Sequence, residues 1–95
     1  MTESGARPLV VARELVVIAK DQPVARDRLV DEFLPVIGDI ARARSTGDHA
    51  ELTQAGVVGL LRALDRYDPE FGTPFWAYAS WWVRHAVEQF VAGRG

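Results

Sequence analysis

The sequence contains no cysteine, which excludes disulfide bonds, thiolate zinc sites and a cysteine nucleophile. It has no hydrophobic run of membrane-spanning length, because the longest apolar stretch, residues 9–20, is interrupted by Arg13 and Glu14, and no secretory signal pattern opens the chain. It also has no basic excess, since 11 Lys and Arg residues face 13 Asp and Glu residues and the net charge is -2. These absences predict a cytoplasmic protein without a membrane attachment, whose charge alone does not favour nucleic acid.

Length and composition predict one small folded domain. Hydrophobic residues make up 48% and charged residues 25% of the 95 residues, as in ordinary soluble globular proteins. This length suits a single domain over residues 1–95 with one modest core. Proline and glycine divide the chain into four stretches whose apolar residues recur at helical spacing, with no strand-like alternation. The sequence therefore predicts an all-α domain of about four helices.

The first two predicted helices span residues 8–20 and 23–44. Pro35 lies inside the second, where a proline removes one helical hydrogen bond and clashes with the preceding turn. We therefore expect a kink or a break near residues 33–35. The apolar face of this helix is predicted to consist of Leu29, Phe33, Val36, Ile37 and Ile40.

The third predicted helix follows a loop that ends at Asp48. Asp48 stands three residues before Glu51, the spacing of an N-cap and its capping partner. Gly56 and Gly59 lie on the apolar side of the helix and would allow a neighbouring backbone to approach closely. The turn-rich residues 68–73 stop the helix.

The fourth predicted helix begins after this linker. Thr73 has the character of an N-cap, and Pro74 suits the first helical position. Apolar residues at helical spacing predict a buried stripe, which consists of Phe75, Ala79, Trp82, Val83, Ala86 and Phe90.

No pattern in the sequence predicts catalysis, a cofactor or a metal. The chain has no glycine-rich phosphate loop after a strand, no evident Ser, His and acid constellation and no close carboxylate pair. His49 stands at a helix start and is expected to be solvated. His85 and Glu88 are three apart on a helix, which two metal ligands can use, but no third or fourth ligand is evident. We therefore expect that the protein is not an enzyme and that it has no cofactor and no metal site.

Aromatic residues are concentrated in one short part of the chain. Seven of the nine aromatic residues lie between positions 67 and 82. A small core accounts for Phe75 and one tryptophan, but not for all seven. On a helix, the remaining side chains form an aromatic and polar stripe that suits base stacking or a partner groove, and each stacked ring contributes about 1–3 kcal/mol. The stripe consists of Tyr78, Trp81, Trp82, His85, Glu88 and Gln89.

Three segments, residues 25–44, 51–72 and 75–87, closely resemble region 2 of bacterial RNA polymerase sigma factors of the sigma-70 family. The most specific parts of the resemblance are Gly59-Leu60 with Ala63 and Asp65, the run Tyr67-Asp68-Pro69 with Gly72, and the run from Tyr78 to Arg84. Residues 1–22 are expected to form a preceding helix, residues 25–92 the region 2 match, and no residues correspond to region 4.

The resemblance implies a helical domain that docks on the clamp helices of the beta-prime subunit of core RNA polymerase. By position, Glu51, Leu52 and Gln54 match the family's docking motif. Glu51 has a second interpretation as the carboxylate of a capping box, and one residue could serve both roles. Ala55 stands where the family usually has an acidic residue, so one polar contact to the clamp helices is missing.

The resemblance also implies capture of the minus-ten promoter element as single-stranded DNA. Tyr67, Tyr78 and Trp81 match aromatic residues around a flipped base, and Trp82 matches the residue at the edge of the opened duplex. Arg62 and Arg84 match basic positions near the DNA backbone, although salt bridges with Asp65 or Glu88 are an equally open alternative. The predicted DNA-binding residues are Arg62, Tyr67, Phe75, Tyr78, Trp81, Trp82, Arg84, His85, Glu88 and Gln89.

Several departures from the family pattern fall on this side of the domain. Thr73 and Pro74 stand where the family commonly has an aromatic and a basic residue, and Trp76 and Ala77 stand where it has small hydroxyl residues. His85 stands where the family has a glutamine, and Glu88 and Gln89 stand where it has a hydroxyl and a basic residue. A carboxylate such as Glu88 is repelled by phosphate, but it can accept a hydrogen bond from a cytosine amino group. Either the promoter preference is altered or DNA binding is weakened.

The leading hypothesis is therefore a sigma-factor domain that binds core RNA polymerase and melts the minus-ten element. The alternative is a region-2-only subunit or decoy that binds polymerase or an anti-sigma protein without reading DNA. A third hypothesis is a helical module whose aromatic stripe packs on another helix.

Overall fold

The computed structural model describes residues 13–44 and 48–94. Within these ranges the chain forms α1 (Arg13–Ala19), α2 (Pro23–Arg44), α3 (His49–Arg66), the 3-10 helix η2 (Pro69–Phe71) and α4 (Phe75–Arg94), with no strand. The prediction of an all-α domain with four helices is confirmed. The predicted helical residues 8–12, with Pro8, and the predicted loop residues 45–47 lie outside the described residues. None of the described helices is both long and apolar enough to cross a membrane.

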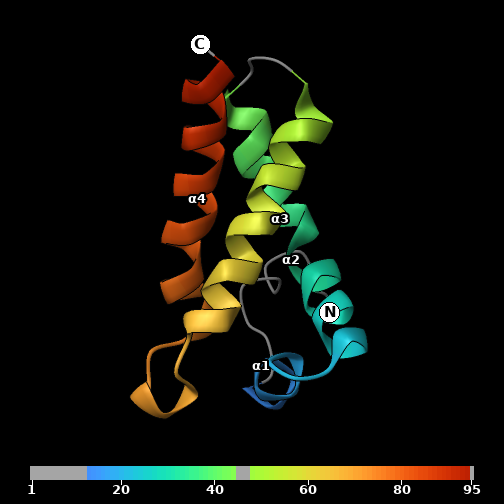
Figure 1. Cartoon of the computed structure of the whole chain (residues 1–95), viewed down its shortest axis with the longest axis vertical. Helices are drawn as coiled ribbons and strands as arrows, with labels where there is room; N and C mark the ends of the chain where they lie inside the picture. Colours follow the sequence, from blue (N-terminus) through green and yellow to red (C-terminus); the bar gives the residue numbers. More distant parts are fainter. Residues whose placement is uncertain (1–12, 45–47, 95) are drawn as a thin grey trace, which may run out of the picture.

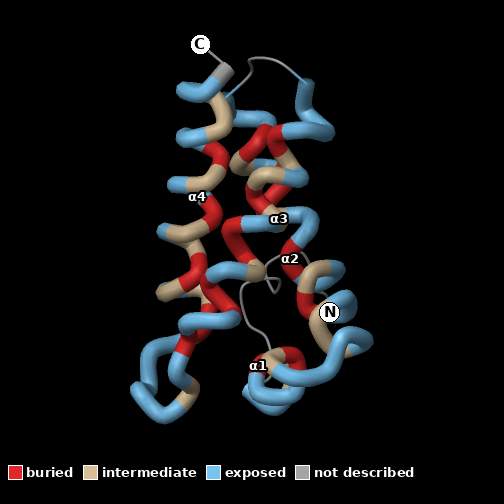
Figure 2. Tube along the Cα trace, in the orientation of Figure 1, coloured by how far each residue is buried: buried red, intermediate tan, exposed pale blue. Residues whose placement is uncertain are grey.

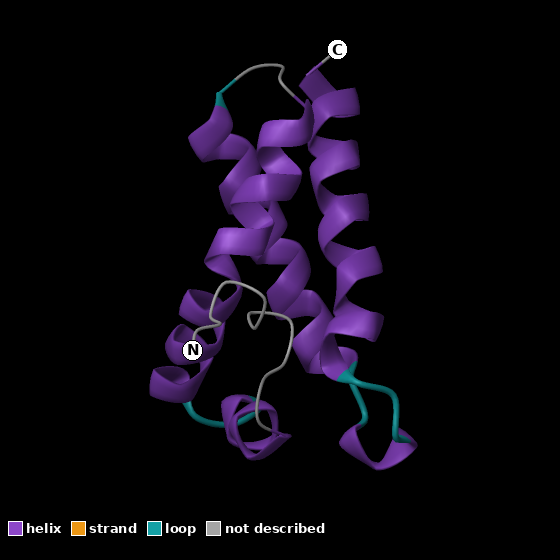
Figure 3. Ribbon diagram, turned by 180° about the vertical axis from the view of Figure 1, so that it is seen from behind, coloured by secondary structure: helices purple, strands orange, loops and turns teal. Residues whose placement is uncertain are grey.

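The three long helices lie side by side, and α1 lies across one end of them near the start of α2 (Figure 1). α3 packs against both α2 and α4, so it is the central helix of the layer. Seen from behind, the loop that carries η2 projects at the same end as α1 (Figure 3). The α3–α4 junction and α1 therefore meet at one end of the domain, and α1 contacts η2 there.

Buried residues line the inner faces of the helices, and exposed residues line their outer faces (Figure 2). The larger of two buried clusters contains residues of every α-helix, including Val16, Phe33, Leu60 and Val83. The rings of Phe33 and Trp76 stack with their centroids 5.1 Å apart. The smaller cluster lies toward the other end of the layer and consists of Ala41, Leu52 and Val87.

Two glycines of α3 allow the close helix contacts that the sequence predicted. A methyl group added at Gly59 would lie 2.5 Å from the Trp82 carbonyl oxygen and 2.9 Å from the Ala86 Cβ. One added at Gly56 would lie 2.6 Å from the Ile37 Cγ2. A side chain at Gly59 would meet backbone and push α3 away from α4, so glycine is required there for the observed packing, whereas one at Gly56 would require the end of the Ile37 side chain to shift.

The buried stripe of α4 differs from the predicted one. Residues four apart form it, namely Phe75, Ala79, Val83 and Val87, whereas Trp82, Ala86 and Phe90 are half-buried. The reason is the contact at Gly59, which places the backbone of Trp82 against α3 and leaves the indole at the edge of the interface.

Of the kink or break predicted near residues 33–35, the break does not occur, because α2 is a single helix from Pro23 to Arg44. Pro35 and Asp31, whose carbonyl oxygen loses its helical donor, are both exposed. Water can satisfy that carbonyl, so the proline is tolerated on this side of the helix.

The helix caps agree with the sequence at α3 and differ at α4. Asp48 caps α3, since its Oδ1 accepts a hydrogen bond from the Ala50 N–H at 2.9 Å. At α4 the Pro74 carbonyl accepts the first helical bond, from the Tyr78 N–H at 3.3 Å, so Pro74 takes the N-cap position predicted for Thr73. The shift arises because the Thr73 carbonyl accepts a hydrogen bond from the Tyr67 hydroxyl instead.

Candidate nucleic-acid interface

Four ring side chains on the outer side of α4 form a continuous surface, which we call the aromatic surface: Tyr78, Trp81, Trp82 and His85. Trp81 is 59% exposed. Its ring stacks on His85 with centroids 4.5 Å apart and packs edge-on against Trp82 at 5.7 Å. Tyr78 lies 6.3 Å from Trp82. The helical spacing predicted this grouping, and the contacts hold the rings against one another at the surface.

Tyr67 and Phe75 lie beneath the aromatic surface. Both were predicted to contact DNA, yet they are only 8% and 5% exposed. Their rings pack edge-on at 5.2 Å, and Tyr67 lies 5.6 Å from Tyr78. The hydroxyl of Tyr67 donates to the Thr73 carbonyl, which ties the ring across the loop. In this structure the pair supports Tyr78 from below and adds little open surface of its own.

The predicted salt bridges of Arg62 and Arg84 are not formed among the described residues. Asp65 pairs with Arg26 at 2.6 Å, and Glu88 pairs with Arg44 at 3.1 Å, so both carboxylates have other partners. Arg62 and Arg84 are exposed. Both guanidinium groups are therefore available to bind phosphate. The sequence alone could not decide between phosphate binding and salt bridges for these two arginines.

Sequence reasoning missed Arg66. Its guanidinium carbon lies 5.6 Å from the centroid of the Trp82 ring, over its face, a cation-π arrangement. Arg66 occupies the last turn of α3 and brings a positive charge to the edge of the aromatic surface. Its place directly before Tyr67 in the sequence was the available signal.

His85 and Glu88 face different neighbours. The His85 ring stacks on Trp81, whereas the Glu88 carboxylate reaches Arg44 at the end of α2. No three His, Asp or Glu side chains in residues 13–44 and 48–94 converge as metal ligands. The ion pair also compensates the carboxylate that was expected to repel phosphate. Gln89 is exposed on the same helix.

The predicted docking residues separate into two groups. Glu51 and Gln54 are exposed, and Val58, 48% exposed, follows them along the outer face of α3. Leu52 is 2% exposed and packs in the smaller cluster, because helical periodicity places it on the inner face with Gly56. Leu52 therefore holds α3 in position, and Ala55 is half-buried at the edge of the outer face.

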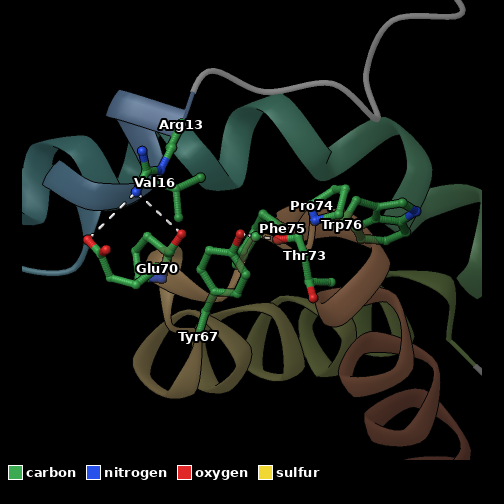
Figure 4. A pocket seen from close by; sticks show the side chains of 10 residues that line it. Arg13, Val16, Tyr67, Glu70, Thr73, Pro74, Phe75 and Trp76 are labelled. Carbon is green, nitrogen blue, oxygen red and sulfur yellow. Dashed lines mark hydrogen bonds and ion pairs between the residues drawn. The ribbon is translucent and has the colours of Figure 1, made fainter.

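A cavity of about 610 Å³ lies between α1, η2 and the first turn of α4 (Figure 4). Tyr67, Phe75 and Trp76 form part of its wall. Arg13 closes one side, since its Nη2 donates to the Pro69 carbonyl at 3.3 Å and lies 3.8 Å from the Glu70 carboxylate. A shallower hollow of about 440 Å³ separates α2 from α4 beside the Arg44–Glu88 pair.

Residues 29–95 match the family model described as Sigma-70 region 2. The chain belongs to the sigma-70 region 2 family. The match runs from within α2 to the end of α4, so this sigma-70 region 2 chain has both the outer face of α3 and the aromatic surface inside the matched residues. The predictions of the family and of a non-enzymatic protein are confirmed by this membership.

A curated relative of this sigma-70 region 2 chain is the RNA polymerase sigma factor RpoS of Coxiella burnetii (strain RSA 493 / Nine Mile phase I). The two are 34% identical over 97 aligned positions, which cover 96% of this chain and 28% of the relative. The chain thus spans little more than a quarter of that sigma factor's length.

Proposed function

We propose that this chain is a sigma-factor domain of transcription initiation. It docks on core RNA polymerase through the outer face of α3 and captures the single-stranded minus-ten element on the aromatic surface of α4. The observation that carries the proposal is the exposed, ring-stacked Trp81, supported through Trp82 and Tyr78 by buried rings.

The energetics of base capture suit this surface. Flipping a base from a duplex costs a few kcal/mol of lost stacking and pairing. Each base stacked on an aromatic side chain returns about 1–3 kcal/mol. Because Tyr78 and Trp81 already pack against Trp82, little rotamer freedom remains to be lost when a base arrives.

The charges suit a domain that meets DNA inside a larger complex. The net charge of -2 gives weak attraction to a free duplex. Arg66 nevertheless lies beside Trp82 at the edge of the aromatic surface, and Arg62 and Arg84 are exposed on α3 and α4. We infer that polymerase supplies the remaining attraction, and that the domain acts in the cytoplasm.

We assign docking on the beta-prime clamp helices to Glu51, Gln54 and Val58. These three follow one another along the solvent side of α3, at positions separated by three and four residues. An exposed valine flanked by polar side chains is a suitable centre for a helix-to-helix contact. Leu52 contributes from inside by fixing the first turns of the helix.

A decoy that engages polymerase without reading DNA has less support. Such a protein has no need of an exposed stack of rings, and the Arg44–Glu88 pair removes the strongest electrostatic objection to DNA. We therefore do not propose it.

The test uses the chain reconstituted with core RNA polymerase and a pool of forked DNA whose unpaired non-template strand carries a randomised hexamer. The complex should retain a distinct subset of hexamers. For a selected fork, Tyr78→Ala and Trp81→Ala should each weaken binding by about tenfold, the loss of one stacking contact. Val17→Ala, which removes an exposed apolar side chain on α1, is the control and should change nothing. Unchanged binding by both aromatic variants would contradict the proposal.

Docking is tested separately. Gln54→Ala should weaken binding to core polymerase and to the isolated clamp helices. Gln22→Ala, on the exposed turn between α1 and α2, is the matched control. Equal affinity of the two variants and the wild type would remove docking from the outer face of α3.

A further inference from the structure

Lys20 is the only lysine of the chain, whose other ten basic residues are arginines. It lies in the turn that follows α1, and its ammonium reaches across to the carboxyl end of α3. Nζ donates to the Leu64 carbonyl at 2.8 Å, to the Tyr67 carbonyl at 2.8 Å and to the Asp65 carbonyl at 3.4 Å. One side chain thus joins two elements that are more than forty residues apart.

The chemistry of this position explains why a lysine is found there. The last carbonyl groups of a helix lack helical partners and carry a partial negative charge, so they favour a cation. Three carbonyl oxygens converge on one point, which suits the three donors of a compact ammonium. A guanidinium presents its donors in a plane and cannot match this geometry as well.

The three bonds fix the point at which the chain leaves α3. Tyr67 is the extended C-cap residue, and Lys20 holds its carbonyl. The ring of the same residue is tied to the Thr73 carbonyl and supports Tyr78 at 5.6 Å. A shift of the Tyr67 backbone would therefore be transmitted to the aromatic surface through one ring contact.

Other contacts of the same region strengthen this arrangement. Arg13 of α1 donates to the Pro69 carbonyl of η2 (Figure 4), and Arg26 at the start of α2 pairs with Asp65 at 2.6 Å. The hydrogen bonds of these two arginines are exposed, whereas the Lys20 bonds to Leu64 and Tyr67 are partly buried. Lys20 thus makes the most shielded of these three polar links between the amino-terminal part of the domain and the α3–α4 junction.

We propose that Lys20 is a positioning residue for the capture of single-stranded DNA: it holds Tyr67, and through Tyr67 the aromatic surface, in the receiving geometry without touching DNA. The inference rests on the proposed function. It assigns a role to the turn after α1, which precedes the residues matched by the family model.

The first experiment compares Lys20→Met with Arg28→Met, which removes one positive charge from the exposed side of α2. Both variants are reconstituted with core polymerase and measured well below their unfolding midpoints. Lys20→Met should bind the selected forked DNA about tenfold more weakly, because Tyr67 and the rings above it are no longer held in place and ordering them then costs part of the binding free energy. Lys20→Met should bind core polymerase with the affinity of the wild type. Arg28→Met should bind the forked DNA with the affinity of the wild type. Lys20→Arg should recover only part of the loss.

A second experiment separates the ammonium from the fold. Because the chain has no cysteine, Lys20→Cys introduces a unique thiol. Its thiolate displaces bromide from 2-bromoethylamine, and the new carbon–sulfur bond gives an ammonium side chain of lysine length. Alkylation with iodoacetamide, in which the thiolate displaces iodide, gives a neutral side chain. DNA affinity should return with the first reagent and not with the second.

Three outcomes would overturn the inference. If Lys20→Met binds DNA like the wild type while Tyr78→Ala does not, the positioning role is wrong and the proposed function stands. If neither Lys20→Met nor Tyr78→Ala affects DNA binding, both the positioning role and the proposed function are wrong. If Lys20→Met loses core affinity and DNA affinity equally, and aminoethylation restores neither, Lys20 serves only the fold.

Discussion

The outer face of α3 and the aromatic surface of α4 are built in different ways. The first consists of single side chains on a regular helix, and Glu51, Gln54 and Val58 need only that helix to stay in place. The second is layered, since exposed Trp81 contacts Trp82, Trp82 contacts Tyr78, and Tyr78 rests on buried Tyr67. The proposed docking should therefore survive local changes that the proposed base capture would not.

The largest effect should come from breaking the contact on which both surfaces depend. Gly59→Ala places a Cβ against the Trp82 carbonyl and Ala86, and we expect the free energy of unfolding to fall by about 3 kcal/mol. Urea denaturation measures this change. Gly38→Ala is the matched control, because its Cβ would meet nothing closer than Arg42 Nη2 at 3.9 Å, and it should stabilise the domain by about 0.5–1 kcal/mol. Equal effects would show that α3 and α4 do not need close approach.

Leu52→Ala should have the next largest effect and distinguishes the two groups of predicted docking residues. Removing a buried leucine side chain leaves a cavity beside Ala41 and Val87, and the free energy of unfolding should fall by about 2 kcal/mol. Gln54→Ala should leave stability within about 0.5 kcal/mol of the wild type. Thermal unfolding of both variants provides the comparison, and a stable Leu52→Ala variant would contradict the buried position.

Tyr67→Phe tests the layering of the aromatic surface. It removes the hydroxyl bond to the Thr73 carbonyl but keeps the ring, so about 1 kcal/mol of stability should be lost. We expect forked DNA to bind several-fold more weakly, and core polymerase to bind as before. Fluorescence anisotropy with labelled fork and labelled clamp helices measures both. An equal loss in the two assays would mean that the two surfaces are not separable.

The smallest effect on stability should come from Glu88→Thr, since the Arg44–Glu88 pair is half-exposed and such pairs contribute about 0–1 kcal/mol. The change removes a carboxylate from the helix that is proposed to face DNA, and it releases Arg44. DNA affinity should rise by a few-fold, most clearly at low salt. If it falls instead, Glu88 reads a base.

Local patterns were sufficient for much of the fold. Helical spacing gave the bounds of α2, Asp48 gave the cap of α3, and Gly56 and Gly59 marked the close helix contacts. The spacing of apolar residues predicted the wrong buried stripe for α4. Which face of α4 is buried depends on its contact with Gly59 of α3, and this contact cannot be predicted from the spacing within α4 alone.

The site was less accessible from sequence. The resemblance assigned Tyr78 and Trp81 to DNA binding, and in the structure Trp81 is exposed and Tyr78 is half-buried on the same helix. It did not show that Tyr67 is buried or that Lys20 caps α3, since both depend on contacts between segments far apart in the chain. Which partner a long cationic side chain reaches is decided by tertiary structure, not by its neighbours in sequence.

The unequal size of the two buried clusters has a consequence for local opening. The end that holds Leu64, Tyr67 and Phe75 belongs to the large cluster, whereas the first turn of α3 depends on the small one around Leu52. Amide hydrogens near Leu64 should therefore exchange with solvent more slowly than those near Leu52. The end proposed to dock on polymerase would then open more readily than the end proposed to capture DNA.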